Sequence, residues 1–218
     1  MKITYISAGA TSHRNDDHVA VFEHAGATDI LVIDGGTSVT ERDYLDRVHG
    51  DVTWFVHAFT AALEQELAPG RSQQECVHAA IDAVRARFEE IIGQDAMPLH
   101  AWPIAAMTWM RMLRARREFQ NTQPAPTVLC LRPNGAFQAR VRSLDLKPGT
   151  SLLIMTDGFY RLVDPYGRYT DRALVGACLE RGLLAMLDEL RTHESVSGGT
   201  GVRAVKAADD ASAAIWTV

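Results

Sequence analysis

The pattern of apolar and polar positions along the chain first indicates short β-strands near both ends. Runs of about four to eight residues rich in Val, Ile, Thr, Tyr and Phe, bounded by polar or turn-forming residues, are typical of strands. Near the N-terminus this pattern predicts strands at 2–7 (KITYIS), 18–23 (HVAVFE) and 28–34 (TDILVID). Towards the C-terminus it predicts strands at 150–156 (TSLLIMT) and 211–218 (ASAAIWTV).

Between these strands, apolar residues recur every three or four positions, which predicts amphipathic helices over 51–67 and 72–93. Ser72 and Glu75 form an S-x-x-E capping box at the start of the second helix, and Gly93 is suited to its end. The predicted apolar face of the first helix is Val52, Phe55, Val56, Phe59, Leu63 and Leu67. That of the second helix is Val77, Ile81, Val84, Phe88 and Ile92.

The remaining segments are predicted from apolar spacing and from turn-forming residues. Residues 126–142 contain two β-rich runs joined by Pro-Asn-Gly, which favours a hairpin. The pattern at 102–120 fits either a strand or a helix, and 195–202 (SVSGGTGV) predicts a flexible turn. A third amphipathic helix is predicted over 171–191, with Leu174, Cys178, Leu183, Leu187 and Leu190 facing inward.

Composition narrows the class of protein. The chain has 218 residues, 47% hydrophobic and 22% charged, which suffices for one substantial core, so we predict a single domain over 1–218. The net charge of −5 argues against a nucleic-acid partner. No apolar run is long enough for a signal peptide or a membrane span, so we expect a cytoplasmic protein without a membrane partner. The widely spaced Cys76, Cys130 and Cys178 predict buried thiols.

Acidic residues stand where several of the apolar runs begin or end. A carboxylate at the end of a buried strand is costly unless a cation or a hydrogen bond compensates it. Clustered carboxylates with few histidines nearby suit hard divalent cations such as Mg²⁺ or Mn²⁺ rather than zinc. A single Asp-Gly pair after a strand is most often a turn that the aspartate caps. The acidic positions are Asp16, Asp17, Asp34, Asp157, Asp209 and Asp210.

The order of these acidic segments resembles that of the metal-dependent serine/threonine protein phosphatases of type 2C. In that family an R-x-x-N-E-D stretch is followed by D-G-x-G, then by D-G-x-x-D, and finally by D-N-x-T. The corresponding segments here are SHRNDD, DGGT, DGFYR and DDAS. The resemblance covers nearly the whole chain. It implies an α+β fold in which two packed antiparallel β-sheets are flanked by helices, an α-β-β-α sandwich.

The resemblance also implies a centre of two Mn²⁺ or Mg²⁺ ions that activates water for attack on a phosphorylated protein substrate. Asp34 would bridge both ions, and the backbone carbonyl of Gly35 would bind one of them. Asp157 and Asp209 would complete the ligands of one ion, and Asp16 would hold a water molecule on the other. The implied function is therefore that of a metal-dependent phosphomonoesterase.

Three further positions carry expectations about phosphate and metal binding. Asp17 would stand beside Asp16 in the catalytic site. The phosphate-binding arginine of the family falls at Ser12, so we expect the nearby Arg14 or the more distant Arg161 to contact phosphate instead.

Two aspartates that hold a third ion in the family are replaced here by Pro126 and Arg161. Proline offers no side-chain oxygen and arginine adds positive charge, so we expect at most two ions.

Two functions of other classes stay open at this point. The departures from the family motifs also fit a phosphatase-like module that binds a partner without catalysis. The segment IDGGTS resembles the phosphate loop of sugar-kinase or chaperone-type ATPases. That motif is one residue short here, and the chain is short for the two similar lobes of such enzymes.

Overall fold

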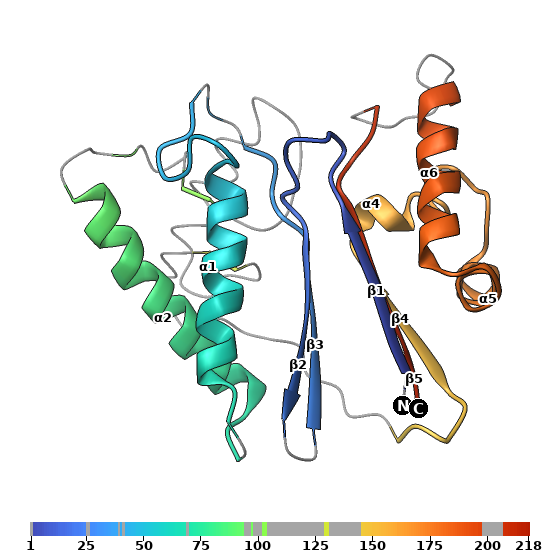
Figure 1. The fold of residues 1–218 in the computed structure, drawn as a ribbon, viewed down its shortest axis with the longest axis horizontal. Coiled ribbons are helices and arrows are strands. Elements are labelled where there is room, and N and C mark those ends of the chain that lie inside the picture. Colours follow the sequence, from blue (N-terminus) through green and yellow to red (C-terminus); the bar gives the residue numbers. More distant parts are fainter. Residues whose placement is uncertain are drawn as a thin grey trace. The chain divides into compact units, whose positions relative to one another are not determined.

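The computed structural model describes residues 2–24, 27–38, 40, 42–68, 70–93, 97, 102–103, 129–130, 145–197 and 207–218. The chain divides into two compact units, one formed by Met1–Asp34 with Ser143–Val218 and the other by Gly35–Arg142. The described elements make an α+β protein with two small antiparallel sheets, which confirms the predicted class (Figure 1). The finer prediction of one α-β-β-α sandwich over 1–218 stays a prediction.

The first unit contains both sheets. Strands β1 (Lys2–Ala8), β5 (Ala211–Thr217) and β4 (Ser151–Met155) form an antiparallel sheet in that order. Strands β2 (His18–His24) and β3 (Ala27–Ile33) form an antiparallel pair that contacts the first sheet. Each of these strands lies where an apolar run predicted it, so these predictions are confirmed.

The central strand β5 carries small, deeply buried side chains. Ala211, Ala213 and Ala214 are each at most 1% exposed. Helix α6 (Leu183–Ser197) and the β2–β3 pair both contact β5, and Figure 1 shows them on opposite sides of its sheet. Small side chains on a central strand let both neighbours approach closely. The strand is therefore held on both faces, directly after the acidic pair Asp209 and Asp210.

Helices α4 (Asp157–Tyr160) and α5 (Asp171–Arg181) complete the first unit together with α6. Helices α5 and α6 pack against each other, and α4 contacts β5. Burial of large apolar side chains, each worth about 1.5–3 kcal/mol, stabilises this arrangement. The fully buried members of the core are Phe159, Leu162, Leu174, Met186 and Leu190.

The prediction of one helix over 171–191 is wrong, because the structure breaks it at Gly182. Gly182 adopts φ 83°, a left-handed conformation that glycine tolerates, and its N–H caps the carbonyl of Cys178. The predicted inward positions are nevertheless all buried, since the two helices cover the same core. Helix α6 also extends to Ser197, so the predicted turn at 195–202 begins too early; its residues 198–202 lie outside the described part.

The second unit contains α1 (Asp51–Glu66) and α2 (Gln73–Ile92), which pack against each other as their apolar faces predicted. The capping box of Ser72 and Glu75 is confirmed, with both reciprocal hydrogen bonds present, and Gly93 is the C-cap. Three residues of the predicted apolar faces are less buried than predicted. Leu67 is the C-cap of α1, and Val77 and Ile92 of α2 are only half-buried. Cys76 takes a buried place on α2 instead, one position from Val77.

Two of the remaining predictions concern segments that lie mostly outside the described residues, and one concerns the cysteines. The segments predicted at 102–120 and 126–142 lie outside the described residues except for 102–103 and 129–130. The predicted buried thiols are confirmed, because Cys76, Cys130 and Cys178 are all buried and none forms a disulfide. Among the described helices, none has the length and apolar character needed to cross a membrane.

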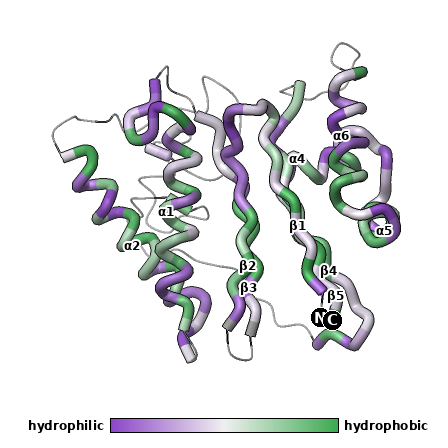
Figure 2. Tube along the Cα trace, in the orientation of Figure 1, coloured by the Kyte–Doolittle hydropathy of each residue, from purple (hydrophilic) through white to green (hydrophobic). Residues whose placement is uncertain are grey.

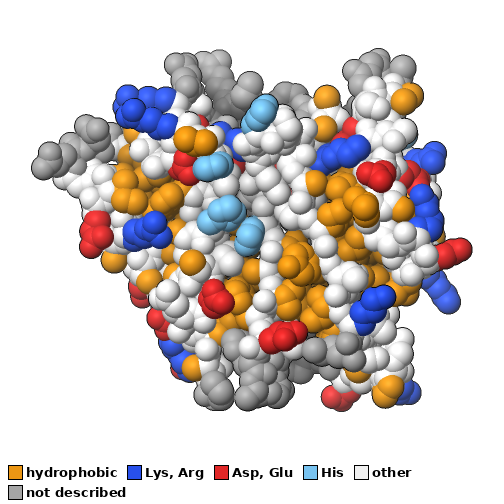
Figure 3. Space-filling view, in the orientation of Figure 1, with side chains coloured by type: hydrophobic (Ala, Val, Ile, Leu, Met, Phe, Trp, Pro, Cys, Tyr) orange, Lys and Arg blue, Asp and Glu red, His pale blue; other side chains and the backbone are white. Residues whose placement is uncertain are grey.

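Hydropathy and charge follow the elements in a regular way. Figure 2 shows hydrophobic positions along the strands and in stripes on the helices, with hydrophilic positions between them. On the face that Figure 3 shows, acidic and basic side chains are interspersed rather than gathered in one patch.

Candidate functional site

The ends of three elements bring Asp34, Asp157 and Asp209 together in the first unit. Asp34 directly follows β3, Asp157 is the first residue of α4, and Asp209 stands two residues before β5. The backbone N–H of Asp157 donates a hydrogen bond to Oδ2 of Asp34 over 3.3 Å. Asp34 and Asp157 are therefore in contact, Asp209 is near enough to affect the charge of Asp34, and their role as metal ligands stays a prediction.

Asp34 has an unusual electrostatic environment. Partial burial, with the negative charges of Asp157 and Asp209 nearby, raises the pKa of Asp34 from 3.8 to about 7. The N–H of Asp157 opposes this rise but does not cancel it. In the part of the chain that the structure describes, ion pairs engage Asp16 and Asp209 but neither Asp34 nor Asp157.

The position after Asp157 has room only for a glycine, Gly158. A Cβ atom at this position would lie 1.8 Å from the backbone carbonyl oxygen of Asp210. Only glycine lets α4 approach the segment before β5 so closely. The glycine of the TDG segment thus places Asp157 near Asp34 and Asp209, rather than forming a turn of its own.

The carboxylate of Asp210 accepts hydrogen bonds from two backbone N–H groups. Its Oδ1 accepts the N–H of Ala10, and its Oδ2 accepts the N–H of Asp16, both over 2.7 Å. These two bonds close the loop between β1 and β2 against the start of β5. Gly9 allows the same closure, because a Cβ there would lie 2.0 Å from the carbonyl oxygen of Arg14. The loop that carries Arg14 and Asp16 is therefore anchored to the acidic pair before β5.

The predicted catalytic residues Arg14, Asp16 and Asp17 lie in this loop. Nε of Arg14 donates to Oδ1 of Asp16 over 3.1 Å, and the side chain of Arg14 is 31% exposed. Asp17 is buried, and its Oδ2 accepts the hydroxyl of Thr156 over 2.7 Å. The same Thr156 oxygen accepts the N–H of Ser212 over 3.0 Å. Asp17 thus holds the end of β4 in register with β5.

Arg161, which we expected to contact phosphate, forms ion pairs with two carboxylates instead. Its Nη2 donates to Oδ2 of Asp209 over 3.2 Å, and its Nη1 donates to Oε1 of Glu194 over 3.3 Å. Its side chain is only 10% exposed. Of the two arginines expected to contact phosphate, Arg14 is therefore the more accessible.

Sequence reasoning missed Glu194 and Arg191, which complete this network. Nη1 of Arg191 donates to Oε2 of Glu194 and to the carbonyl of Asp209, both over 2.7 Å. Its Nη2 donates to the carbonyls of Ala8 and Gly9. A signal was present, because Glu194 continues the apolar stripe of α6 one helical step after Leu190. A charged residue in such a stripe indicates a buried ion pair.

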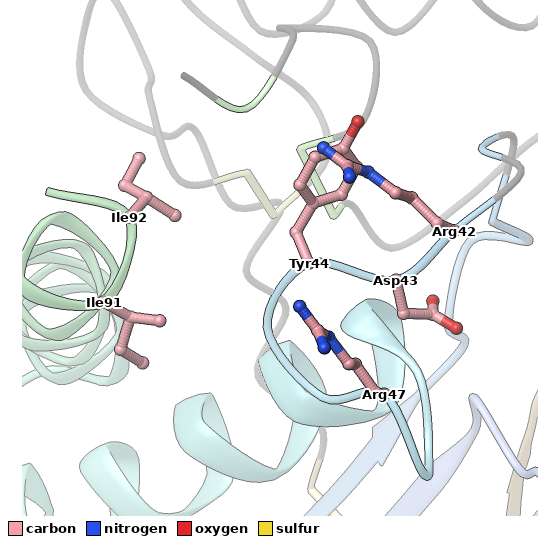
Figure 4. Close-up of a pocket in the computed structure, with 6 residues that line it drawn as sticks. All are labelled: Arg42, Asp43, Tyr44, Arg47, Ile91 and Ile92. Atoms are coloured by element: carbon pink, nitrogen blue, oxygen red, sulfur yellow. The ribbon is translucent and has the colours of Figure 1, made fainter. Parts of the chain in front are cut away.

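The second unit has a separate pocket of about 490 Å³. Its lining residues are Arg42, Asp43, Tyr44, Arg47, Ile91 and Ile92 (Figure 4). The guanidinium of Arg42 lies over the ring of Tyr44, 4.4 Å from its centroid. The buried carboxylate of Asp51 accepts the N–H of Tyr44 and of Leu45, which holds this loop at the start of α1. No residue of the predicted metal site lines this pocket.

Gly35, the expected carbonyl ligand, directly follows Asp34 and is the first residue of the second unit. Among the described residues, no group of three or more His, Cys, Asp or Glu side chains stands at separations suited to a metal ion.

Comparison of the chain with protein-family models, curated proteins and solved structures finds no match.

Proposed function

We propose that this chain is a metal-dependent phosphomonoesterase that acts on phosphorylated proteins, with a divergent type 2C phosphatase sandwich as its fold. The observation that carries the proposal is the approach of Asp34 to Asp157 at the ends of β3 and β4. Burial of the Asp34 carboxyl, together with the nearby negative charge of Asp157, raises the pKa of Asp34 to about 7. Such a pair is stabilised when a cation binds between the carboxylates.

The donor atoms fit a hard divalent cation. Mg²⁺ in proteins is commonly bound by one or two carboxylates, with water molecules as its other ligands. Asp34 and Asp157 supply two carboxylates, and Asp209 stands near them but contacts Arg161. When bound, Mn²⁺ or Mg²⁺ supplies Lewis acidity toward water and phosphate oxygens.

The chain's own residues bind and orient the substrate in this proposal. Arg14 contacts the phosphate in this proposal, because its side chain is 31% exposed and a guanidinium binds phosphate oxygens well, although its Nη2 is buried and its Nε donates to Asp16. Asp16 holds Arg14 in place through the Nε contact. Asp17 and Thr156 fix the end of β4 and therefore the position of Asp157.

A non-catalytic phosphatase-like module is the second candidate function. The observation that favours it is the ion pair between Arg161 and Asp209, which compensates a predicted metal ligand without any metal. In this alternative the site binds a partner, and the carboxylates serve the fold.

Hydrolysis of a generic aryl phosphate tests the proposal. We expect activity with Mn²⁺ or Mg²⁺, no activity with a chelator, and a loss of at least about 100-fold in Asp34→Asn. The control is Asp188→Asn on the exposed side of α6, which removes the same charge elsewhere and should retain full activity. A folded wild-type protein without metal-dependent activity would support the non-catalytic alternative, and full activity in Asp34→Asn would place the site elsewhere.

A further inference from the structure

The pocket in the second unit has one cationic wall and one apolar wall. The loop before α1 supplies the cationic wall, with Arg42, Tyr44 and Arg47 (Figure 4). The end of α2 supplies the apolar wall, with Ile91 and Ile92. Ile91 is 46% exposed, so a ligand can cover its side chain. The volume of about 490 Å³ is within the range of about 300–1,000 Å³ that is typical of small-molecule sites.

The loop of the cationic wall is held by a buried carboxylate. Asp51 is the first residue of α1 and is 2% exposed. Its Oδ1 accepts the backbone N–H of Tyr44 over 2.8 Å and that of Leu45 over 2.7 Å. Asp51 also accepts the N–H of Asp46, over 3.3 Å. Because these bonds fix the loop in the absence of any ligand, a ligand has little ordering cost to overcome.

The two arginines give the pocket a positive charge. The guanidinium of Arg42 lies over the ring of Tyr44, which positions it at the wall. Arg47 is exposed, and no carboxylate of the described residues forms an ion pair with it. Figure 4 shows its guanidinium directed toward the side of the isoleucines. Asp43 also lines the pocket, but its Oδ1 accepts the N–H of Asp51 over 3.2 Å. Two positive groups thus stand against one negative group.

From this arrangement we infer that the pocket binds a small organic phosphate that carries an apolar group. The phosphate lies against Arg42 and Arg47, because a dianion matches two guanidinium charges and each guanidinium can donate to two oxygens. The apolar group covers Ile91 and Ile92, which removes their exposed surface from water. The inference is independent of the proposed function, since no residue of the predicted metal site lines this pocket and binding here breaks no bond.

Isothermal titration calorimetry with phenylphosphonate at pH 8 tests the inference. This probe has an anionic group and an apolar ring but no ester bond that could be hydrolysed. A chelator is present throughout, so that metal ions do not contribute. We expect one site per chain with a Kd of about 1 mM or lower. Inorganic phosphate and benzyl alcohol each lack one of the two groups and should bind at least about tenfold more weakly.

Variants of each wall separate the two contributions. Arg47→Met keeps a long apolar side chain and removes the charge, so phenylphosphonate should bind at least about tenfold more weakly. Ile91→Ser should weaken phenylphosphonate by about threefold and leave inorganic phosphate unchanged. Arg172→Met, at an exposed position on α5, is the control and should bind as the wild type does. Asp34→Asn should also bind as the wild type does.

The outcomes distinguish this inference from the proposed function. Equal binding in wild type and folded Arg47→Met, a Kd above about 10 mM, or loss of binding in Asp34→Asn overturns the inference. None of these results measures metal-dependent hydrolysis, so the proposed function is judged by its own assay. An inactive protein that binds phenylphosphonate through Arg47 supports the inference and contradicts the proposed function. If Arg47→Met does not fold, the effect of Ile91→Ser on phenylphosphonate against inorganic phosphate decides.

Discussion

The backbone N–H of Asp157 donates to a carboxylate oxygen of Asp34 over 3.3 Å, although the two residues are 123 positions apart. This contact brings the carboxylate after β3 to the first residue of α4. One hydrogen bond from an amide does not offset the burial of this carboxyl and the repulsion from neighbouring carboxylates, so the pKa of Asp34 is raised to about 7. The pair therefore lowers the stability of the metal-free protein and favours cation binding.

The stability of the metal-free protein should depend on pH through Asp34. Because its pKa is about 7 in the folded chain and 3.8 ordinarily, the folded state binds the extra proton between these values. The free energy of unfolding should therefore fall as pH rises from about 4 to 7, and level off above. From pH 5.5 to 8 we expect Asp34→Asn to gain about 1 kcal/mol over the wild type.

Urea unfolding in the presence of a chelator measures this difference at both pH values. Added Mn²⁺ should raise the wild-type melting temperature more at pH 8 than at pH 5.5, because the ion competes with the proton on Asp34. A constant difference between Asp34→Asn and the wild type across this range would contradict the raised pKa.

Arg14 should affect substrate binding more than turnover. In Arg14→Ala we expect the KM for an aryl phosphate to rise by about tenfold, with a smaller change in kcat. Arg14→Lys should not restore the KM, because an ammonium group cannot reproduce the two-oxygen contact of a guanidinium. Steady-state kinetics of both variants are the measurement. Arg172→Ala, which removes an exposed arginine on α5, is the control. Unchanged kinetics in Arg14→Ala would leave phosphate binding to the metal alone.

Two glycine substitutions should change stability in opposite directions. Gly158→Ala should destabilise the protein by at least about 2 kcal/mol, because its Cβ would overlap the carbonyl oxygen of Asp210. Gly176→Ala meets nothing within 4 Å and lies inside α5, so it should stabilise by about 0.5–1 kcal/mol. Thermal unfolding of the two variants is the measurement. Equal stability of Gly158→Ala and the wild type would mean that α4 does not approach β5 so closely.

The hydroxyl of Thr156 should be essential to the stability of the first unit. Thr156→Val removes the donor to Asp17 and the acceptor for the N–H of Ser212, which should cost about 1–3 kcal/mol. Thr156→Ser keeps the hydroxyl and should retain most of the stability. Denaturant unfolding compares them with Thr192→Val, an exposed residue on α6 whose hydroxyl, among the described residues, donates only to the backbone carbonyl of Asp188. A loss in Thr156→Val no larger than in Thr192→Val would contradict a role for the buried hydroxyl.

Local features of this protein could be predicted from the sequence because their causes lie within a few residues. Apolar runs predicted the strands, helical spacing predicted α1 and α2, and Ser72 with Glu75 predicted a helix start. The break at Gly182 was missed because apolar spacing continues across it, although a left-handed glycine ends α5 there. Periodicity reports which side chains are buried, but it does not distinguish one helix from two that share a core.

By itself, the sequence determined which carboxylates stand at the ends of strands, since that follows from their position beside apolar runs. Only the tertiary structure decided what compensates each of them. Asp210 accepts backbone N–H groups, Asp209 contacts Arg161, and Asp34 is left facing Asp157. Electrostatic interactions depend on distance in space and on burial, and these partners come from segments that are distant in the chain. No local pattern contains that information.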